Sequence, residues 1–210
     1  MKKKIGLQEI ERFIEEAGSD DLGTFGGKYE GGINCQQIPD ELAPCLLAIM
    51  ESGKKVSNYL EIGAAAGGTT YLIDHFLSPE KIVIIDDDKH TKAGLRKAIL
   101  EKVKAPVTEF IGDSQSEEIS SGLTRWAGGF DLILIDGDHN YPGVKLDVVF
   151  YLPFLLPGGF LALHDSALTK WGVPRVVREL KRDPGMEFVG EYVSTVHPAP
   201  CGLALFRKRE

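Results

Sequence analysis

The sequence predicts an α/β fold of the doubly wound type, in which helices cover both faces of a mostly parallel sheet. From about residue 56 onward, short β-type runs alternate with helical stretches, which is the alternation of βαβ units. Several runs are almost entirely apolar, as expected of parallel strands that are buried on both faces. The five runs are 58–62, 81–86, 106–111, 130–136 and 159–163.

The segments between these runs have helical periodicity. Within residues 90–103, Leu95, Ile99 and Val103 recur on one face and lysines occupy the other, which predicts an amphipathic helix. Another helix is expected to begin near Gly68, directly after a glycine-rich turn.

The C-terminal part follows a different pattern. Residues 171–182 are expected to form a helix, and residues 187–195 and 202–207 two strands joined only by a loop. So short a connection suits an antiparallel pair, because a parallel pair needs a longer crossover. We therefore expect a seven-stranded mixed sheet with an antiparallel C-terminal strand.

The first 55 residues form an N-terminal helical appendage to the domain at 56–210, within a single structural domain overall. An apolar stripe predicts its first helix, and a second helix runs to about Ser52. Between them lies a loop with Gly23, Gly26, Gly27, Gly31 and Gly32. Phe25, Tyr29, Gln36 and Gln37 could close over a ligand as a lid; packing of the appendage on the sheet or on a second subunit fits the sequence equally well.

Composition and charge narrow the class of protein. The net charge of −7 counts against binding to nucleic-acid backbones. The longest apolar run, 148–156, is interrupted by Pro153 and is far shorter than the ~20 residues of a membrane span. No secretory signal is visible. The three cysteines at unrelated spacings are typical of buried or free thiols in a reducing compartment, and not of a disulfide framework or a zinc site. The expected location is the cytoplasm.

The strongest local motif lies in residues 59–70. A strand ends at Ile62, Gly63 and Gly67 open the turn, and the next helix offers unpaired N–H groups. The spacing is G-x-x-x-G-G and not the G-x-G-x-x-G of dinucleotide sites. The glycines of this turn could serve packing alone, but the motif favours a ligand-binding turn.

Three acidic residues end the second strand. A carboxylate at this edge can accept hydrogen bonds from two ribose hydroxyls. Asp86 is the ribose candidate, whereas Asp87 and Asp88 fit better as helix caps or solvent-facing groups.

The segments 61–67, Asp86, 112–115 and 130–136 resemble the ordered motifs of class I S-adenosylmethionine-dependent methyltransferases, a Rossmann-like fold. The resemblance covers residues 56–166. Within that class, the segments 135–141 (IDGDHNY), 156–159 and 163–165 are similar to a small-molecule O-methyltransferase group. This group includes macrolide-sugar O-methyltransferases and proteins named for cephalosporin biosynthesis, and it is related to the metal-assisted catechol O-methyltransferases.

The resemblance assigns cofactor roles by position. Gly63 and Gly67 would pass under the methionine part of the cofactor with Glu61 supporting the turn, and Asp113 and Ser114 would border the adenine. Ser114 could instead cap the next helix. The complete implied cofactor set is Glu61, Gly63, Ala64, Gly67, Asp86, Asp87, Gly112, Asp113, Ser114 and Asp136.

A second group of candidate site residues follows the fourth and fifth predicted strands. Asp136 and Asp165 meet at the carboxyl edge of the sheet, where two carboxylates repel each other unless a cation lies between them. Mg²⁺ or another divalent ion would remove that conflict and could hold the acceptor oxygen. Related metal-assisted enzymes carry Asp-Asn or Glu-Asp at the later strand, where this chain has His164 and Asp165. The expected ligands are therefore Asp136, Asp165 and His164, with the third ligand and metal dependence itself left open.

The expected reaction is methyl transfer to a small hydroxylated acceptor, with Asp136, His139 and His164 as the catalytic candidates. A hydroxyl is a poor nucleophile while protonated, so His139 or His164 could serve as base, as a ligand, or as scaffold. His75, His90 and His197 are expected to be surface or cap residues, and Tyr141 and Trp171 core aromatics or pocket walls.

The alternatives are a metal-independent N-methyltransferase, a nicotinamide-dependent oxidoreductase and a non-catalytic S-adenosylmethionine-binding protein. The expected partner is a small molecule, not nucleic acid or a membrane, and a homo-oligomer is left open.

Overall fold

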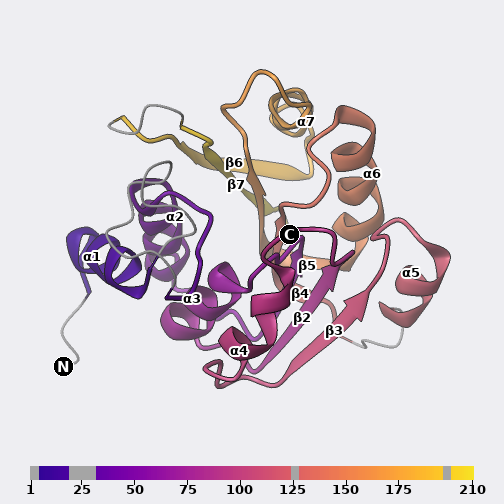
Figure 1. Cartoon of the computed structure of the whole chain (residues 1–210). Coiled ribbons are helices and arrows are strands. Elements are labelled where there is room, and N and C mark those ends of the chain that lie inside the picture. Colours follow the sequence, from indigo (N-terminus) through magenta and orange to yellow (C-terminus); the bar gives the residue numbers. More distant parts are fainter. Residues whose placement is uncertain (1–4, 19–31, 124–127, 196–199) are drawn as a thin grey trace.

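A seven-stranded mixed sheet forms the centre of the computed structural model, which describes residues 5–18, 32–123, 128–195 and 200–210 (Figure 1). The strands are β1 (Asn58–Ile62), β2 (Lys81–Asp86), β3 (Val107–Ile111), β4 (Phe130–Ile135), β5 (Leu155–His164), β6 (Met186–Tyr192) and β7 (Leu203–Lys208). Their order is β3-β2-β1-β4-β5-β7-β6. β1 to β5 pair in parallel, and β7 is antiparallel to both of its neighbours, which confirms the predicted mixed sheet.

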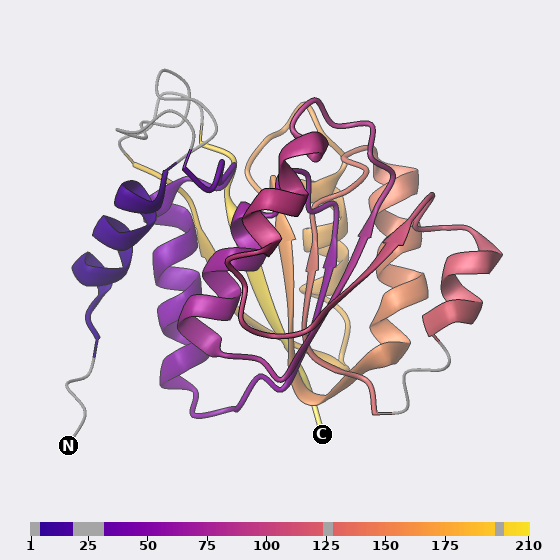
Figure 2. The ribbon, with the colours of Figure 1, turned by 60° about the horizontal axis from the view of Figure 1, so that its bottom comes forward.

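Helices cover both faces of this sheet (Figure 2). They are α1 (Leu7–Ala17), α2 (Pro39–Glu51), α3 (Gly68–Leu77), α4 (Arg96–Leu100), α5 (Glu117–Leu123), α6 (Tyr141–Tyr151) and α7 (Val173–Leu180), with short 3-10 helices η1 (Ala93–Leu95) and η2 (Leu152–Phe154). None of the described helices is long and apolar enough to cross a membrane.

The core consists of two apolar layers separated by the sheet. Successive strand side chains point to opposite faces, so Tyr59 packs with α1 to α4, whereas Leu60 and Ile62 pack with α5 to α7. The parallel strands are buried on both faces, and this explains their nearly continuous apolar sequences.

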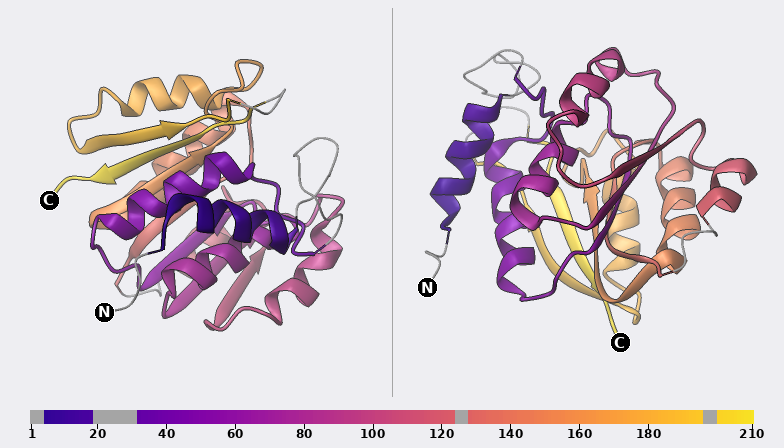
Figure 3. Two further views of the ribbon diagram at one scale, coloured as in Figure 1. Left: turned by 90° about the vertical axis from the view of Figure 1, so that its left-hand side faces the viewer. Right: turned by 90° about the horizontal axis from the view of Figure 1, so that it is seen from below.

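The N-terminal helices belong to the first of these layers. α1 packs on α2, and Leu42 and Leu46 of α2 share a buried cluster with the strands (Figure 3). The carboxylate of Glu41 accepts the backbone N–H groups of Ser194 and Gly202, which ties α2 to the ends of β6 and β7. α2 is therefore part of the sheet's packing. Phe25, Tyr29 and most of the glycine-rich loop lie outside the described residues.

The helix predicted over residues 90–103 is wrong in length, whereas its predicted apolar face is confirmed at Ile99 and Val103 but not at Leu95. Only η1 and α4 form there, and Leu95 is 42% exposed whereas Arg96 is 3% exposed. The reason is electrostatic, because the Arg96 guanidinium is surrounded by carboxylates from neighbouring segments. The helix expected over residues 171–182 is also shorter, since α7 covers only Val173–Leu180.

Candidate active site

A cavity of about 730 Å³ lies at the carboxyl edge of the parallel strands. This is where α/β folds place their ligands, because the strand ends and the helix N-termini converge there. Its lining is Gln36, Ile62, Gly63, Ala65, Ile85, Asp86, Asp87, Lys89, His90, Gly112, Asp113, Ser114, Gln115, Asp136, Gly137, Asp138, His139, His164, Asp165, Leu168, Lys170 and Cys201.

Most of the residues assigned to the cofactor by resemblance line this cavity. They are Gly63, Asp86, Asp87, Gly112, Asp113, Ser114 and Asp136. Glu61, Ala64 and Gly67 are not part of the wall. Glu61 is buried beneath the turn and accepts a hydrogen bond from the Thr70 hydroxyl, and burial raises the pKa of its carboxyl to about 8. The cofactor roles of all these residues stay predictions.

Gly63 brings the turn after β1 against the end of β4. Its φ is +82°, and a Cβ atom at this position would lie 2.2 Å from the carbonyl oxygen of Asp136. Only glycine tolerates both the conformation and the close approach. The cofactor turn and the candidate catalytic Asp136 are consequently neighbours.

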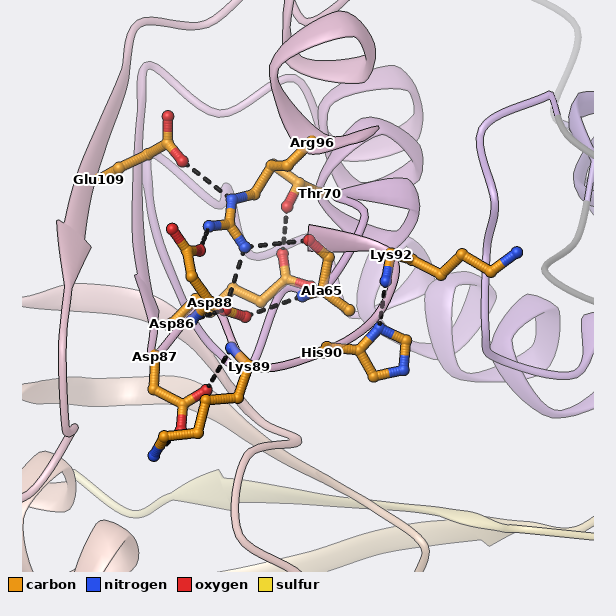
Figure 4. A network of polar contacts seen from close by, with 11 residues as sticks. Ala65, Thr70, Asp86, Asp87, Asp88, Lys89, His90, Lys92, Arg96 and Glu109 are labelled. Atoms are coloured by element: carbon orange, nitrogen blue, oxygen red, sulfur yellow. Dashed lines mark hydrogen bonds and ion pairs between the residues drawn. The ribbon is translucent and has the colours of Figure 1, made fainter. Parts of the chain in front are cut away.

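Arg96 joins the turn after β1 to the end of β2 and the middle of β3 (Figure 4). Its Nη1 donates to the carbonyl of Ala65 at 2.9 Å and lies 3.1 Å from Oδ1 of Asp86. Its Nε donates to Glu109 at 2.9 Å, and its Nη2 donates to Asp88. Asp88 is solvent-facing, as expected, and is also an ion-pair partner of Arg96. We call these residues the Arg96 clamp: Ala65, Asp86, Asp88, Arg96 and Glu109.

The ribose candidate Asp86 and its neighbour Asp87 differ in their surroundings. Asp86 is buried, and its carboxylate accepts the backbone N–H groups of Ala65 at 2.9 Å and Asp88 at 2.8 Å. Asp87 is partly exposed and accepts a hydrogen bond from Nζ of Lys89 at 2.7 Å, which lowers the pKa of its carboxyl. Both residues line the cavity.

Ser114 does not cap the following helix. Its hydroxyl donates to Oδ1 of Asp147 at 2.7 Å, whereas the hydroxyl of Ser116 accepts the backbone N–H of Ile119 in the first turn of α5. Asp147 lies fully buried on α6, and this burial raises the pKa of its carboxyl to about 6.

Two histidine–carboxylate pairs occupy the other half of the cavity. Nδ1 of His139 lies 2.5 Å from Oδ2 of Asp165, and Nδ1 of His164 lies 2.9 Å from Oδ1 of Asp136 and 3.7 Å from Oδ1 of Asp165. The hydrogen bond with Asp165 raises the pKa of His139. Burial opposes protonation of His164, but Asp136 and Asp165 outweigh it and raise its pKa to about 9.

The same residues form two groups of potential metal ligands. In each group, one donor atom from every member lies within 4.8 Å of the others. One group is Asp136, His139 and Asp165, and the other is His164, Asp165 and Cys201. The structure therefore brings the predicted ligands Asp136, Asp165 and His164 to one place and adds His139 and Cys201. Nothing in the sequence spacing indicated Cys201, which is 36 residues beyond Asp165.

Gln37 connects the N-terminal segment to this site. Its side chain is 3% exposed, and its Nε2 donates to Oδ2 of Asp136 at 2.7 Å while its Oε1 accepts the hydroxyl of Thr69. Gln36 is 3.0 Å from Nε2 of His90. His90 is exposed and its Nδ1 accepts the backbone N–H of Lys92, as expected of a surface or cap residue, and it also lines the cavity.

The predicted aromatic walls do not line the cavity. Tyr141 donates its hydroxyl to Glu179, and Trp171 packs against the imidazole of His139 at 5.3 Å between ring centroids. His75 stacks on Phe13 and so joins α3 to α1. His197 lies outside the described residues.

Comparison with known proteins identifies the family. Residues 60–166, half of the chain, match the family model described as a methyltransferase domain. The uncharacterized protein R132 of Acanthamoeba polyphaga mimivirus is 26% identical over 125 residues. That match covers 57% of this chain and 55% of the viral protein, so this chain corresponds to about half of its relative.

Solved structures share the fold at low sequence identity. The O-methyltransferase TomG from Streptomyces achromogenes, involved in tomaymycin synthesis and solved with S-adenosylmethionine, has a TM-score of 0.67 and 17% identity over 99% of this chain and 92% of its own. The N-methyltransferase NodS from Bradyrhizobium japonicum has a TM-score of 0.57 and 22% identity over 80% and 94%. MycE, from the mycinamycin biosynthetic pathway and solved with Mg and S-adenosylhomocysteine, has a TM-score of 0.55 and 19% identity over 80% and 48%.

The sheet order and the antiparallel β7 are consistent with the family match. That match includes the turn after β1 and the ends of β4 and β5. The chain belongs to the methyltransferase-domain family and shares its fold with the O-methyltransferase TomG, which was solved with S-adenosylmethionine.

Proposed function

We propose that the protein methylates a hydroxyl oxygen of a small molecule, with His139 as the general base. The observation that carries this proposal is the pairing of His139 with Asp165 on the cavity wall, beside Asp136. A cavity of about 730 Å³ has the size of a small-molecule site, typically ~300–1,000 Å³. The net charge of −7 also argues against a nucleic-acid acceptor.

The reaction is an in-line displacement at the sulfonium methyl group. The acceptor oxygen forms the new C–O bond as the S–CH₃ bond breaks, and S-adenosylhomocysteine leaves. When Nδ1–H of His139 is donated to Asp165, the lone pair on Nε2 can accept the acceptor's proton. Asp165 fixes the tautomer and stabilises the imidazolium that results, and Trp171 restricts the ring on one side.

A divalent ion fits the same residues. The Asp136 and Asp165 carboxylates converge within ligand distance, and Nε2 of the buried His164 has no hydrogen-bond partner among the described residues. Asp136, Asp165 and His164 would hold the ion, which when bound would lower the pKa of the acceptor hydroxyl. Gln37 would keep the Asp136 carboxylate oriented. The Mg present with MycE supports this assignment.

N-methylation is the second candidate, and the likeness to NodS favours it. An amine acceptor needs little assistance in losing a proton, so His139 and Asp165 would matter little. Replacing Asp165 with alanine separates the two reactions, because an N-methyltransferase would keep most of its activity.

The test begins with calorimetric titration of S-adenosylmethionine and S-adenosylhomocysteine, with Mg²⁺ and with EDTA. Hydroxylated and amine acceptors are then screened for S-adenosylhomocysteine formation. We expect His139→Gln to lose roughly 10²–10⁴-fold in rate with hydroxyl acceptors while cofactor binding is unchanged. Unchanged methylation in this variant would refute the assignment of His139 as the base.

A further inference from the structure

Cys201 occupies a position in the cavity that the methyl-transfer reaction does not use. It precedes β7, is largely buried, and shares the cavity wall with His164 and Asp165. Its sulfur, one ring nitrogen of His164 and one oxygen of Asp165 lie within 4.8 Å of one another. The other cysteines, Cys35 and Cys45, do not line the cavity.

The backbone holds the cysteine in this place. The N–H of Ala167 donates to the carbonyl of Cys201 at 2.9 Å, and the N–H of Ser166 donates to the carbonyl of Gly202 at 3.2 Å. The segment after β5 and the segment before β7 are therefore hydrogen-bonded to each other. Asp165 and Cys201 face the same cavity because of this pairing, not because of their sequence spacing.

His164 has the environment of a metal-binding histidine. Its Nδ1 is hydrogen-bonded to Asp136, whereas its Nε2 is buried and has no partner in the part of the chain that the structure describes. A buried ring nitrogen without a partner is costly. Histidines that bind metals commonly donate one ring N–H to a carboxylate and coordinate through the other nitrogen.

The chemistry of the donors selects the class of ion. Mg²⁺ prefers oxygen ligands and retains water, whereas imidazole and thiolate ligands suit Zn²⁺, Co²⁺ and related transition-metal ions. We infer that His164, Asp165 and Cys201 bind a divalent transition-metal ion, with Cys201 coordinating as a thiolate. The thiol proton is released to solvent when the sulfur–metal bond forms. This inference rests on the metal-assisted form of the proposed function and changes the expected ion.

Cobalt substitution tests the sulfur–metal bond directly, without an acceptor. Co²⁺ is titrated into the reduced, full-length protein without an affinity tag, and the near-ultraviolet thiolate-to-cobalt charge-transfer band is recorded. We expect the band in the wild type and in Cys45→Ala, and its loss in Cys201→Ser. Absence of the band in the wild type, or its persistence in Cys201→Ser, would overturn the inference.

Two further measurements keep the result independent of how the variants fold. X-ray absorption of the zinc-loaded wild type should show a sulfur neighbour at about 2.3 Å, and a shell of nitrogen and oxygen alone contradicts the inference. In Cys201→Ser that retains the wild-type circular dichroism spectrum, Zn²⁺ affinity should fall by at least the roughly 10–100-fold that loss of an outer-shell partner costs. An unchanged Zn²⁺ affinity would also count against it.

S-adenosylhomocysteine binding, measured on the same samples, separates this inference from the proposed function. Cofactor binding without a cobalt–thiolate band rejects the transition-metal site and leaves the methyltransferase assignment intact. A cobalt–thiolate band without cofactor binding rejects the proposed reaction and supports the metal site.

Discussion

The two halves of the cavity are built in different ways. In the half expected to bind the cofactor, the charges are paired within the protein, and the Arg96 clamp joins three neighbouring segments, the β1–α3 turn, the β2 end and β3. In the half expected to bind the acceptor, Asp136, His139, His164 and Asp165 come together with Gln37 and Cys201 from distant parts of the chain. This second half also contains Nε2 of His164, which is buried and has no hydrogen-bond partner in the part of the chain that the structure describes.

This difference separates a scaffold from a chemical site. Paired charges and satisfied hydrogen bonds fix the shape of the first half before any ligand arrives. Buried polar groups without a partner are found where ligands bind, because the remaining fold must offset their cost. Substitutions in the first half should therefore reduce stability, whereas substitutions in the second should reduce binding of ligands or metals.

The largest expected effect is on stability, in the first half. Arg96→Met removes the cation that faces the buried Asp86 carboxylate, and breaking a buried ion pair from one side costs about 3–5 kcal/mol. Urea unfolding measures the loss, and S-adenosylhomocysteine titration should show weaker binding. The matched control is Lys55→Met, which removes the exposed pair with Glu80 and should cost far less stability, because water and salt screen that pair. Equal effects for the two variants would show that Arg96 is not a structural clamp.

An intermediate effect is expected on metal binding, in the second half. Gln37→Leu removes the amide that donates to Asp136 at 2.7 Å, and loss of such an outer-shell partner typically weakens metal binding roughly 10–100-fold. S-adenosylhomocysteine affinity should remain near that of the wild type. Gln36→Leu is the control, since Gln36 contacts His90 and not Asp136. If Gln37→Leu lost as much cofactor affinity as metal affinity, the proposed difference between the two halves of the cavity would be wrong.

The sequence predicted those parts of the fold that depend on local residue patterns. The apolar runs of β1 and β2 match the observed bounds, because burial on both faces of a parallel sheet produces a continuous apolar run in the sequence. The burial of Arg96 was missed, since its partners Asp86 and Glu109 come from two different strands.

The arrangement of the half expected to bind the acceptor could not be predicted from the spacing of its residues in the sequence. Gln37 is 99 residues from Asp136, and the pairing of the segments before β7 and after β5 brings Cys201 to Asp165. Contacts of this kind depend on tertiary packing, and no sequence period encodes them. The identities of Asp136, His139 and Asp165 were accessible only because they follow strands that end at the same edge.

The smallest expected effect is on stability and concerns Asp147. This residue is an exception in the half expected to bind the cofactor, where the other charges discussed are paired. Its Oδ1 accepts the Ser114 hydroxyl, but Oδ2 is buried without a partner among the described residues. Burial raises the pKa of Asp147 to about 6 in the folded protein, above its unfolded value of 3.8. The protonated carboxyl is therefore favoured by folding, and its stabilising contribution is complete below pH 3.8 and lost as the pH rises through about 6.

Asp147→Asn, which resembles the protonated form, should consequently gain on the order of 1–2 kcal/mol over the wild type at pH 7.5, and this advantage should shrink towards pH 4. Urea midpoints across that pH range measure the difference. A constant offset between the two proteins at every pH would mean that Asp147 does not titrate there. In that case Asp147 would not be an exception to the paired charges of that half, and the contrast between the two halves would be sharper.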